Sequence, residues 1–389
     1  MFEFETELQT VRTGYDRETC WVQTRAGLLP PNDVVITTQK LRLTGSDIFY
    51  AIHSMHSEDS GRTWTEPVEQ ESFAPRPCED GSYFYVSDFW PKWHEATGTL
   101  LGTGHTPLYR DDELMHGAFR RQPAYAVYDA QARSWRSWQP VDLPEDVFFS
   151  SGSGCVQRVD LPDGDILLPV YHRSEAASDD PWHACCNVVV LRCSFDGVAL
   201  RCTDWGNSLT VAEPRGLCEP SLAMFGGRFY LTLRNDVRGY VAASDDGLHF
   251  SEPVPWRFDD GEELGNYNTQ QHWLTFPDAL CLVYTRRGAE NDHVFRHRAP
   301  LFMAEVDPER MCVIRETEQV VLPERGARLG NFGTVDVSDD EGWVVVSEWM
   351  QTNPPNPHDC TVCEKYGSDN AIFIARVRRC GANPSKKEV

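Results

Sequence analysis

The residues whose side chains could most clearly bind a ligand include arginines close to the ends of predicted strands. These arginines are Arg25, Arg234, Arg286 and Arg287. A guanidinium group holds a carboxylate through two parallel, charge-assisted hydrogen bonds, which makes arginine the preferred side chain for that task. The four arginines therefore predict a binding site for a carboxylated ligand.

A second set of residues is able to move protons. We predict His105, Tyr171, His172 and Glu219 as catalytic residues. A histidine or a tyrosine can take a proton from carbon or give one to a leaving oxygen, and a carboxylate can assist either step. The predicted substrate-binding residues are the four arginines together with Gln270, Gln271, His297 and Glu348.

The elements that position these residues read as β-strands. Runs rich in Val, Ile, Tyr, Phe and Trp recur between Gly, Asp, Asn and Pro, and sustained 3.6-residue periodicity is almost absent. The best strand candidates are residues 34–38, 47–54, 164–171, 228–234, 280–284, 342–348 and 371–377. The chain is therefore predicted to be all-β.

A short motif recurs between these strands. Residues 57–64 read SEDSGRTW, residues 244–250 read SDDGLHF as a shortened copy, and residues 194–197 read SFDG as a degraded one. In a tight hairpin, Asp and Ser accept hydrogen bonds from the turn, Gly supplies a positive φ, and the aromatic residue packs between sheets. A motif that recurs with a period of roughly 40 to 60 residues indicates repeated sheets arranged around a common axis.

The motif at residues 57–64 resembles the Asp-box of sialidases and related β-propellers. The resemblance implies a six-bladed β-propeller, with seven blades as the alternative if residues 109–138 are divided differently. Phased on the boxes, the blades cover residues 23–68, 83–141, 152–203, 217–255, 269–320 and 331–378.

The last blade has only three strands of its own in this phasing. Residues 2–11 are the spare strand that could complete it, since a propeller otherwise leaves an exposed sheet edge. We therefore expect a single propeller over residues 1–380 and a disordered tail over 381–389.

The resemblance also implies roles for individual residues. Sialidases clamp a substrate carboxylate with three arginines. By position these would be Arg25 in the segment TRAGLLP, Arg234, and either Arg286 or Arg287. Glu219 resembles the glutamate that in sialidases partners a tyrosine nucleophile.

The chain departs from the sialidase pattern at that nucleophile. Residues 329–334 read LGNFGT, with Phe332 where the tyrosine is expected, and phenylalanine cannot form a glycosyl intermediate. Either Tyr267 or Tyr171 serves instead, or the reaction is a different one. Residues 267–273 and 296–302 resemble segments of propeller polysaccharide lyases, which cleave next to a uronic acid.

β-Elimination needs a cation for the uronate carboxylate, a base for the proton on C5 and an acid for the leaving oxygen. The sequence supplies these types, so it predicts an enzyme that cleaves an acidic, uronate-containing oligosaccharide or polysaccharide by elimination. The alternatives are exo-sialidase-type hydrolysis and glycan binding without catalysis.

The composition limits the other partners. The 36 Lys and Arg residues stand against 59 Asp and Glu, for a formal net charge of −23, so a nucleic acid is not expected as a partner. No stretch of 18 apolar residues is long enough to span a membrane. The first residues have neither a basic start nor an apolar core, so a cytoplasmic location is expected, or secretion if a leader has been removed.

The thirteen cysteines do not form a disulfide pattern, and reduced thiols fit them best. His358, Cys360 and Cys363 are spaced as zinc ligands, but no fourth ligand lies nearby in the sequence. We therefore expect no cofactor, with a structural zinc as the lesser alternative.

Overall fold

The computed structural model describes residues 3–43, 47, 49–115, 121–173, 186–352, 356 and 359–380. Its regular structure is almost entirely β, as predicted from the alternating pattern. The helical segments among these residues are η1 (Glu71–Phe73), η2 (Glu95–Thr97), η3 (Phe295–His297), η4 (Arg315–Thr317) and α1 (Thr361–Lys365).

Six large antiparallel sheets follow one another along the described chain. The first contains β2 (Thr19–Leu29), β3 (Asp33–Arg42), β4 (Phe49–Ser57) and β5 (Val68–Glu69). The second contains β8 (Ser87–His94), β9 (Thr99–His105), β12 (Pro123–Asp129), β13 (Ser134–Trp135) and β14 (Gln139–Pro140). The third contains β15 (Ser150–Gly152), β16 (Val159–Asp160), β17 (Ile166–Arg173), β18 (Asn187–Phe195) and β19 (Leu200–Trp205).

The second half of the chain repeats this plan. The fourth sheet contains β20 (Cys218–Phe225), β21 (Arg228–Arg234), β22 (Tyr240–Ser244) and β23 (Val254–Pro255). The fifth contains β24 (His272–Phe276), β25 (Ala279–Tyr284), β26 (Leu301–Asp307), β27 (Cys312–Val313) and β28 (Gln319–Leu322). The sixth contains β29 (Gly333–Asp336), β30 (Glu341–Ser347), β31 (Ile372–Arg379) and β1 (Phe4–Arg12).

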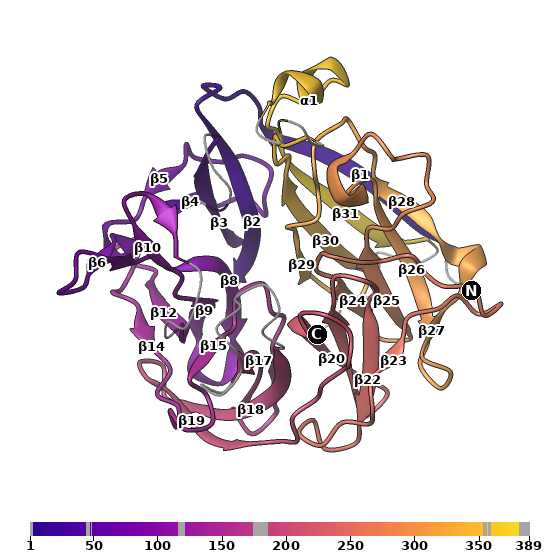
Figure 1. Cartoon of the computed structure of the whole chain (residues 1–389), viewed down its shortest axis with the longest axis horizontal. Coiled ribbons are helices and arrows are strands. Elements are labelled where there is room, and N and C mark those ends of the chain that lie inside the picture. The colour runs from indigo at the N-terminus through magenta and orange to yellow at the C-terminus, as the bar shows by residue number, and fades with distance from the viewer. Residues whose placement is uncertain are drawn as a thin grey trace.

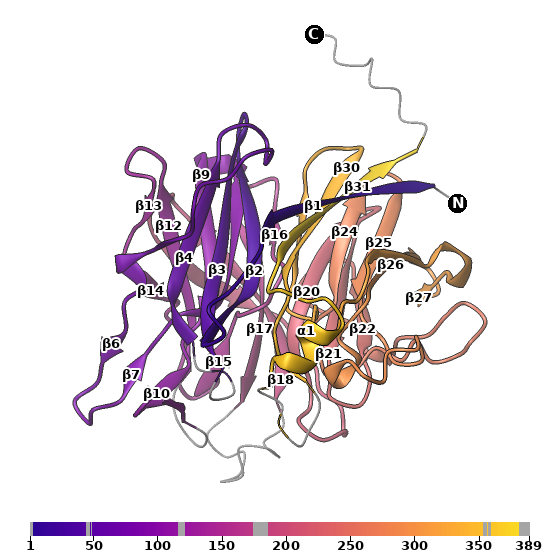
Figure 2. The ribbon, with the colours of Figure 1, turned by 90° about the horizontal axis from the view of Figure 1, so that it is seen from above.

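A smaller sheet lies at the periphery of this arrangement (Figures 1 and 2). It contains β6 (Arg76–Pro77), β7 (Tyr83–Phe84), β10 (Leu108–Arg110) and β11 (Glu113–Leu114). These strands belong to none of the six large sheets. Residues 109–138, whose division could have given a seventh blade, contribute to both this small sheet and the second large sheet.

The hydrophobic core is divided among the spaces between neighbouring sheets. Leu101 of the second sheet packs with Leu168 of the third, and Ile36 of the first packs with Val345 of the sixth. Because the first and last sheets are in contact, the sheets form a closed ring around a common axis (Figure 1). The arrangement is that of a propeller, while the count of six blades stays a prediction because it treats each large sheet as one blade.

The ring is closed by a strand from the beginning of the chain. β1 pairs antiparallel with β31, from Phe4 opposite Arg379 to Thr10 opposite Phe373, and the two strands lie side by side (Figure 2). The predicted use of the first residues to complete the last sheet is confirmed. The phenyl ring of Phe4 packs 5.0 Å from that of Phe276, so β1 also contributes to the core.

The repeated turns have the hydrogen bonds that the sequence predicts. Asp59 accepts hydrogen bonds from the backbone N–H groups of Arg62 and Thr63 at 3.0 and 2.9 Å. Ser57 accepts one from the N–H of Gly61 at 2.8 Å, and Gly61 has a φ of 76°. The turn joins β4 to β5, the third and fourth strands of the first sheet.

We predict that deletion of residues 1–12 destabilises the whole ring, because it leaves β31 with an unpaired edge and uncovers the core beside Phe276. The expected result is a large fall in the thermal unfolding midpoint. The control is Glu5→Ala, which changes an exposed side chain of the same strand and should leave the midpoint close to that of the wild type. Equal stability of the truncated and full-length proteins would show that closure does not depend on β1.

Candidate active site

Three of the predicted site residues, two of them catalytic and one substrate-binding, lie near the ends of the second strands of their sheets. His105 ends β9, Arg234 ends β21, and Tyr171 lies close to the end of β17. Each of these strands runs away from the turn that connects it to the innermost strand. The ends of the three strands therefore lie at one face of the ring.

Three innermost strands share an irregularity close to this face. Their pairing with the next strand shifts between Val22 and Arg25, between Ser87 and Trp90, and between Cys218 and Ser221. In each bulge one residue has a positive φ, namely Gln23 (56°), Asp88 (53°) and Glu219 (43°). A bulge re-aims a side chain, and a positive φ at a residue other than glycine is costly, so it persists where the surrounding structure demands it.

A buried polar pair stands at one side of the site. The hydroxyl oxygen of Tyr171 and Nδ1 of His105 are 2.5 Å apart. Nε2 of His105 lies 3.7 Å from Oδ2 of Asp88, and Oδ1 of Asp88 accepts a hydrogen bond of 3.2 Å from Arg25. The Tyr171–His105 pair is thus backed by an ion pair.

Arg25 connects this pair to the opposite side of the ring. It is fully buried and donates to Oε1 of Gln270 at 3.0 Å and to the carbonyl of Gln23 at 3.2 Å. Oε1 of Gln270 lies 3.1 Å from Nε2 of His272, whose Nδ1 is 2.6 Å from the hydroxyl of Ser221. Arg25 and Gln270, both predicted to bind substrate, therefore hold innermost segments of different sheets together.

Burial controls protonation in this chain of contacts. It raises the pKa of Tyr171 well above its usual value, and it lowers the pKa of His105 well below, with the positive charges of Arg121 and Arg25 acting in the same direction on His105. Burial also raises the pKa of Asp88, although the charge of Arg25 opposes it. At neutral pH the pair therefore consists of a protonated tyrosine and a neutral histidine.

Glu219 and Arg234 form the second part of the site. One guanidinium nitrogen of Arg234 donates to both carboxylate oxygens of Glu219 at 2.6 Å. The other donates to the side-chain oxygen of Asn268 at 2.9 Å and to Asp236 at 3.3 Å. Burial alone would raise the pKa of Glu219, but the charge and hydrogen bonds of Arg234 hold it below its usual value.

Arg298 lies beside the Glu219–Arg234 pair. Unlike Arg234, it has no carboxylate partner among the described residues. Its side chain is buried and donates to the carbonyl and the side-chain oxygen of Asn268 at 3.1 and 3.2 Å, and to Asn331 at 3.4 Å. No described residue forms a salt bridge with it. Burial, followed by the charge of neighbouring Arg328, lowers its pKa well below the usual value. A buried guanidinium with only neutral partners is suited to an anionic ligand.

The other two predicted arginines make ion pairs elsewhere. Arg286 donates to Glu318 at 2.8 and 2.7 Å, and Arg287 donates to Glu263 at 2.9 Å. Arg287 also lies over the ring of Tyr267, 5.1 Å from its centroid. The structure therefore brings Arg298, rather than either of these arginines, next to Arg234.

His297 and Tyr267 form a separate pair. The hydroxyl of Tyr267 is 2.5 Å from Nδ1 of His297, and Nε2 of His297 is 3.1 Å from Asp292. Tyr267, the sequence's alternative nucleophile, thus bonds to a histidine and not to Glu219.

His172 does not join the Tyr171–His105 pair. Its Nε2 lies 3.1 Å from the hydroxyl of Ser208, and its ring packs 5.1 Å from that of Phe148. Successive residues of a strand point to opposite faces, so a tyrosine directed at His105 leaves the next residue pointing away.

Two further predicted residues are engaged within the fold. The side-chain oxygen of Gln271 accepts a hydrogen bond from Thr232 at 3.2 Å. Glu348 is buried and accepts hydrogen bonds from Arg325 at 2.9 Å and from the backbone N–H of Ala371 at 3.0 Å. These contacts occupy the polar atoms that a substrate would need.

The sequence reasoning missed four residues of the site, which are Asp88, Asp236, Asn268 and Arg298. A signal existed for Arg298, because residues 296–298 read RHR and stand out as basic in an acidic chain. Asp88 had none, since its orientation depends on a bulge.

The zinc hypothesis is not tested, because His358 lies outside the described residues. Within the described ranges, no group of three or more His, Cys, Asp or Glu side chains is arranged to hold a metal ion. A search of those same residues for a helix long and apolar enough to cross a membrane found none.

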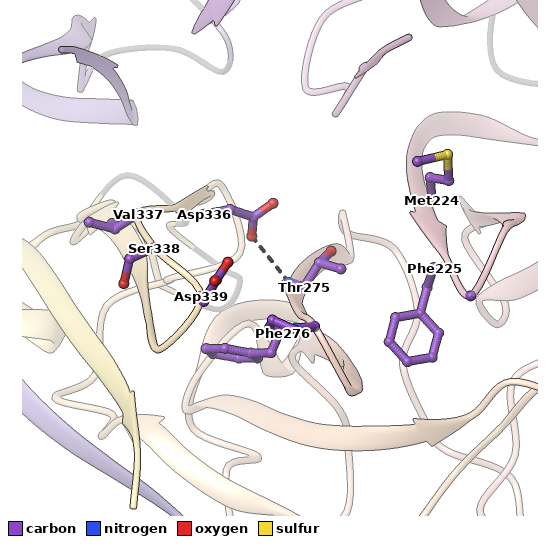
Figure 3. Close-up of a pocket in the computed structure, with 10 residues that line it drawn as sticks. Met224, Phe225, Thr275, Phe276, Asp336, Val337, Ser338 and Asp339 are labelled. Carbon is purple, nitrogen blue, oxygen red and sulfur yellow. Dashed lines mark hydrogen bonds between the residues drawn. The ribbon is translucent and has the colours of Figure 1, made fainter. Parts of the chain in front are cut away.

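Figure 3 shows a surface hollow of the structure and the residues that line it. It is lined by the turn before β21, the end of β24 and the turn after β29, where Asp336 accepts a hydrogen bond of 3.1 Å from the N–H of Thr275. Gly226 of the hollow precedes β21 and Arg234 ends it, which separates the two regions by roughly 20 Å along the strand. The hollow is therefore not part of the candidate active site.

The closed ring of antiparallel sheets is a β-propeller, and its fold is similar to that of solved sialidases. A microbial sialidase from the Hadza (Hz136) superposes with a TM-score of 0.64 at 13% identity, covering 95% of this chain and 68% of that one. Trypanosoma rangeli sialidase in complex with sialic acid superposes with a TM-score of 0.59 at 11% identity, and this chain spans 59% of its length.

A protein of unknown function from Dyadobacter fermentans is similar over the greatest shared length of these three. It has a TM-score of 0.63 and 16% identity, covering 96% of this chain and 99% of that one. No protein-family model and no curated protein matches the chain. At these identities the likeness shows the fold alone.

The buried histidines predict a dependence of stability on pH. Burial lowers the pKa of His272 well below its usual value of about 6.5, so the folded protein keeps it neutral while the unfolded chain protonates it. Stability is therefore lost as the pH falls through 6.5, by at most about 1.4 kcal/mol per pH unit for each such histidine.

Urea unfolding at pH 7.5 and 5.5 measures this loss, and His272→Gln should make it smaller than in the wild type. The control is His249→Gln on an exposed turn, which should not reduce the loss. A wild type equally stable at both pH values would contradict the assignment of neutral buried histidines.

Proposed function

We propose that this propeller is a carbohydrate-active enzyme that binds a carboxylated glycan at Arg234 and Arg298 and cleaves it with the Tyr171–His105 pair. The observation that carries the proposal is the buried guanidinium of Arg298, which has only neutral oxygens as partners in the described part of the chain. In a chain with 59 acidic residues, an arginine left without a carboxylate is suited to an anion supplied from outside. The sialidase-like fold supports a glycan as the carrier of that anion.

The reaction that the site supports best is β-elimination next to a uronate. The arginines would neutralise the carboxylate, which makes the hydrogen on C5 more acidic. As the C5–H bond breaks, its electrons form the C4–C5 double bond, the C4–O bond breaks, and the leaving oxygen takes up a proton. The Tyr171–His105 pair would carry this proton from C5 to the leaving oxygen, so no net proton is gained or lost.

Sialidase-type hydrolysis is the second candidate, favoured by the fold. It requires a tyrosine nucleophile activated by a glutamate. Both oxygens of Glu219 accept hydrogen bonds from Arg234, and no tyrosine hydroxyl of the described residues is bonded to Glu219. Phe332 is fully buried and packs 4.7 Å from the ring of His272. These contacts favour elimination over a tyrosine–glutamate mechanism.

Glycan binding without catalysis is the third candidate. It would keep the arginines but has no use for a neutral histidine held 2.5 Å from a protonated tyrosine. The experiments below separate it from the enzymatic candidates, because a binding protein shows no turnover of any acidic oligosaccharide.

Arg298→Ala tests the carboxylate site. Loss of a desolvated charge pair with the substrate should cost about 2 to 5 kcal/mol of transition-state binding, on the order of 30- to 5,000-fold in kcat/KM. The assay is absorbance near 235 nm, where the unsaturated product of uronate elimination absorbs. Substrates with reduced carboxyl groups should be turned over poorly by the wild type.

Arg228→Ala is the matched control, since this exposed arginine lies at the other end of the strand that carries Arg234. Its kcat/KM should equal that of the wild type. Equal turnover of acidic and carboxyl-reduced substrates would contradict the carboxylate site.

The mechanism is tested by comparing three further variants on one acidic oligosaccharide. In an elimination, His105→Ala and Tyr171→Phe should each lower kcat by roughly 10²- to 10⁴-fold, whereas Glu219→Gln should be milder because its carboxylate acts through Arg234. Tyr267→Phe is the control for loss of a paired tyrosine hydroxyl outside the site.

The opposite order of effects would favour hydrolysis. If Glu219→Gln alone abolishes turnover while the His105 and Tyr171 variants remain near the wild type, elimination is excluded. A reducing sugar released without any rise at 235 nm would lead to the same conclusion.

A further inference from the structure

A second buried arginine near the proposed carboxylate site makes no side-chain hydrogen bond or ion pair with any residue that the structure describes. The backbone of Arg328 pairs with that of Trp349 through hydrogen bonds of 3.1 and 2.9 Å, and its side chain is only 3% exposed. Nε and Nη2 of the guanidinium are buried and make no hydrogen bond, and no described residue forms a salt bridge with this side chain. Two of the three guanidinium nitrogens of Arg328 therefore lack an acceptor in the described part of the chain.

Aromatic rings hold this guanidinium in position. Its central carbon lies 3.8 Å from the centroid of the Trp349 ring and 5.1 Å from that of Phe295. Stacking on an aromatic face leaves the N–H donors at the edge of the guanidinium plane unused. Nε1 of Trp349 is likewise buried without an acceptor. Two neighbouring side chains thus present buried donors and lack the oxygen atoms that would satisfy them.

The fold itself gains little from a charge at this position. Burial lowers the pKa of Arg328 to about 9, a change that the charge of Asp47 opposes and that of Arg296 reinforces. A buried charge without a partner destabilises a protein, and an apolar side chain of similar size would remove that cost. A ligand that brings negative oxygens to Arg328 accounts for the charge.

The balance of charges indicates how many negative groups this ligand has. Around the Glu219–Arg234 pair lies a cluster of charged side chains that influence one another electrostatically. It contains five guanidinium groups and three carboxylates, namely Arg215, Arg234, Arg296, Arg298 and Arg328 with Asp47, Glu219 and Asp236. The cluster therefore has two more guanidinium groups than carboxylates; Arg298 and Arg328 are buried, Arg296 is exposed to solvent, and Arg25 is already paired with Asp88. A substrate with one carboxylate at Arg234 and Arg298 would leave the buried guanidinium of Arg328 without an anionic partner.

We propose that Arg328, with Nε1 of Trp349, forms a second anion subsite, and that the substrate is a glycan with two anionic groups. The inference rests on the proposed function: one carboxylate binds at Arg234 and Arg298, and a second oxyanion binds at Arg328. The second oxyanion is either the carboxylate of an adjacent uronate or a sulfate ester, since each can present two negatively charged oxygens to a guanidinium.

Binding measurements on three disaccharides test the proposal. They share one backbone and carry one carboxylate, two carboxylates, or one carboxylate and one sulfate ester. Calorimetric titration uses the full-length Tyr171→Phe variant to prevent turnover. We expect at least tenfold tighter binding of a two-anion ligand than of the one-anion ligand, and the ligand that shows the gain identifies the second oxyanion.

Arg328→Met in the same background tests the assignment to this residue. The affinity lost for the two-anion ligand should exceed that lost for the one-anion ligand by at least tenfold. Arg228→Ala is again the control, and it should preserve the difference between the ligands. Equal binding of one-anion and two-anion ligands by the parent protein overturns the subsite, as does a gain that survives in Arg328→Met.

Two outcomes of these binding measurements distinguish failure of the second anion subsite from failure of the proposed function. If the one-anion ligand binds and the second anion adds nothing, the subsite fails and the proposed function stands. If no carboxylated ligand binds, both fail. Arg328→Met should also raise the thermal unfolding midpoint, because it removes an unpaired buried charge, and a lower midpoint would show that the arginine supports the fold instead.

Discussion

The pairing of β1 with β31 is the constraint on which the other features depend. It covers the edge of the last sheet and presses that sheet against the first, where Ile36 and Val345 share a core. The contact is close at Gly333, where a Cβ atom would lie 2.8 Å from Cγ of Arg25. Only a closed ring with glycine at that position has room for Arg25 at the axis, and Arg25 in turn supports the Tyr171–His105 pair through Asp88.

The site itself is built from departures from regular β-structure. A regular strand directs every second side chain to the same face, which places apolar residues between the sheets. Bulges at Gln23, Asp88 and Glu219 interrupt that order in three innermost strands. Gln23 and Asp88 then bond to residues of a neighbouring sheet, and Glu219 bonds to Arg234 of the next strand. The cost of three left-handed residues is met by the hydrogen bonds and ion pairs they make possible.

These facts explain what could be predicted from the sequence. Strand positions depend on local alternation and turn residues, so the strand expected at 228–234 is β21, Arg228–Arg234, and the sheet expected at 217–255 begins and ends within one residue of those limits. The closeness of Glu219 and Arg234 also followed, because they lie at the adjoining ends of paired strands, where Arg234 is opposite Cys218. Their chemical roles remain predictions.

The rest of the candidate site depends on geometry that the alternation of apolar and polar residues does not encode. Asp88 is aimed by a bulge, and Arg298 lies in the segment before β26, where no periodicity indicates a direction. Strand ends pointed to Arg286, but its partner Glu318 comes from a segment 32 residues away. His172 was grouped with Tyr171 because both end a strand, although neighbouring residues in a strand face opposite ways.

The register of the closing strands has a mechanical consequence. Phe4 lies opposite Arg379, so the two outer ends of the paired strands are at the same side of the ring. Tension applied between them would load the hydrogen bonds one pair at a time, as in opening a zipper, instead of shearing all of them together. The pairing that covers the edge of the last sheet is thus the first contact to be loaded when its two outer ends are pulled apart.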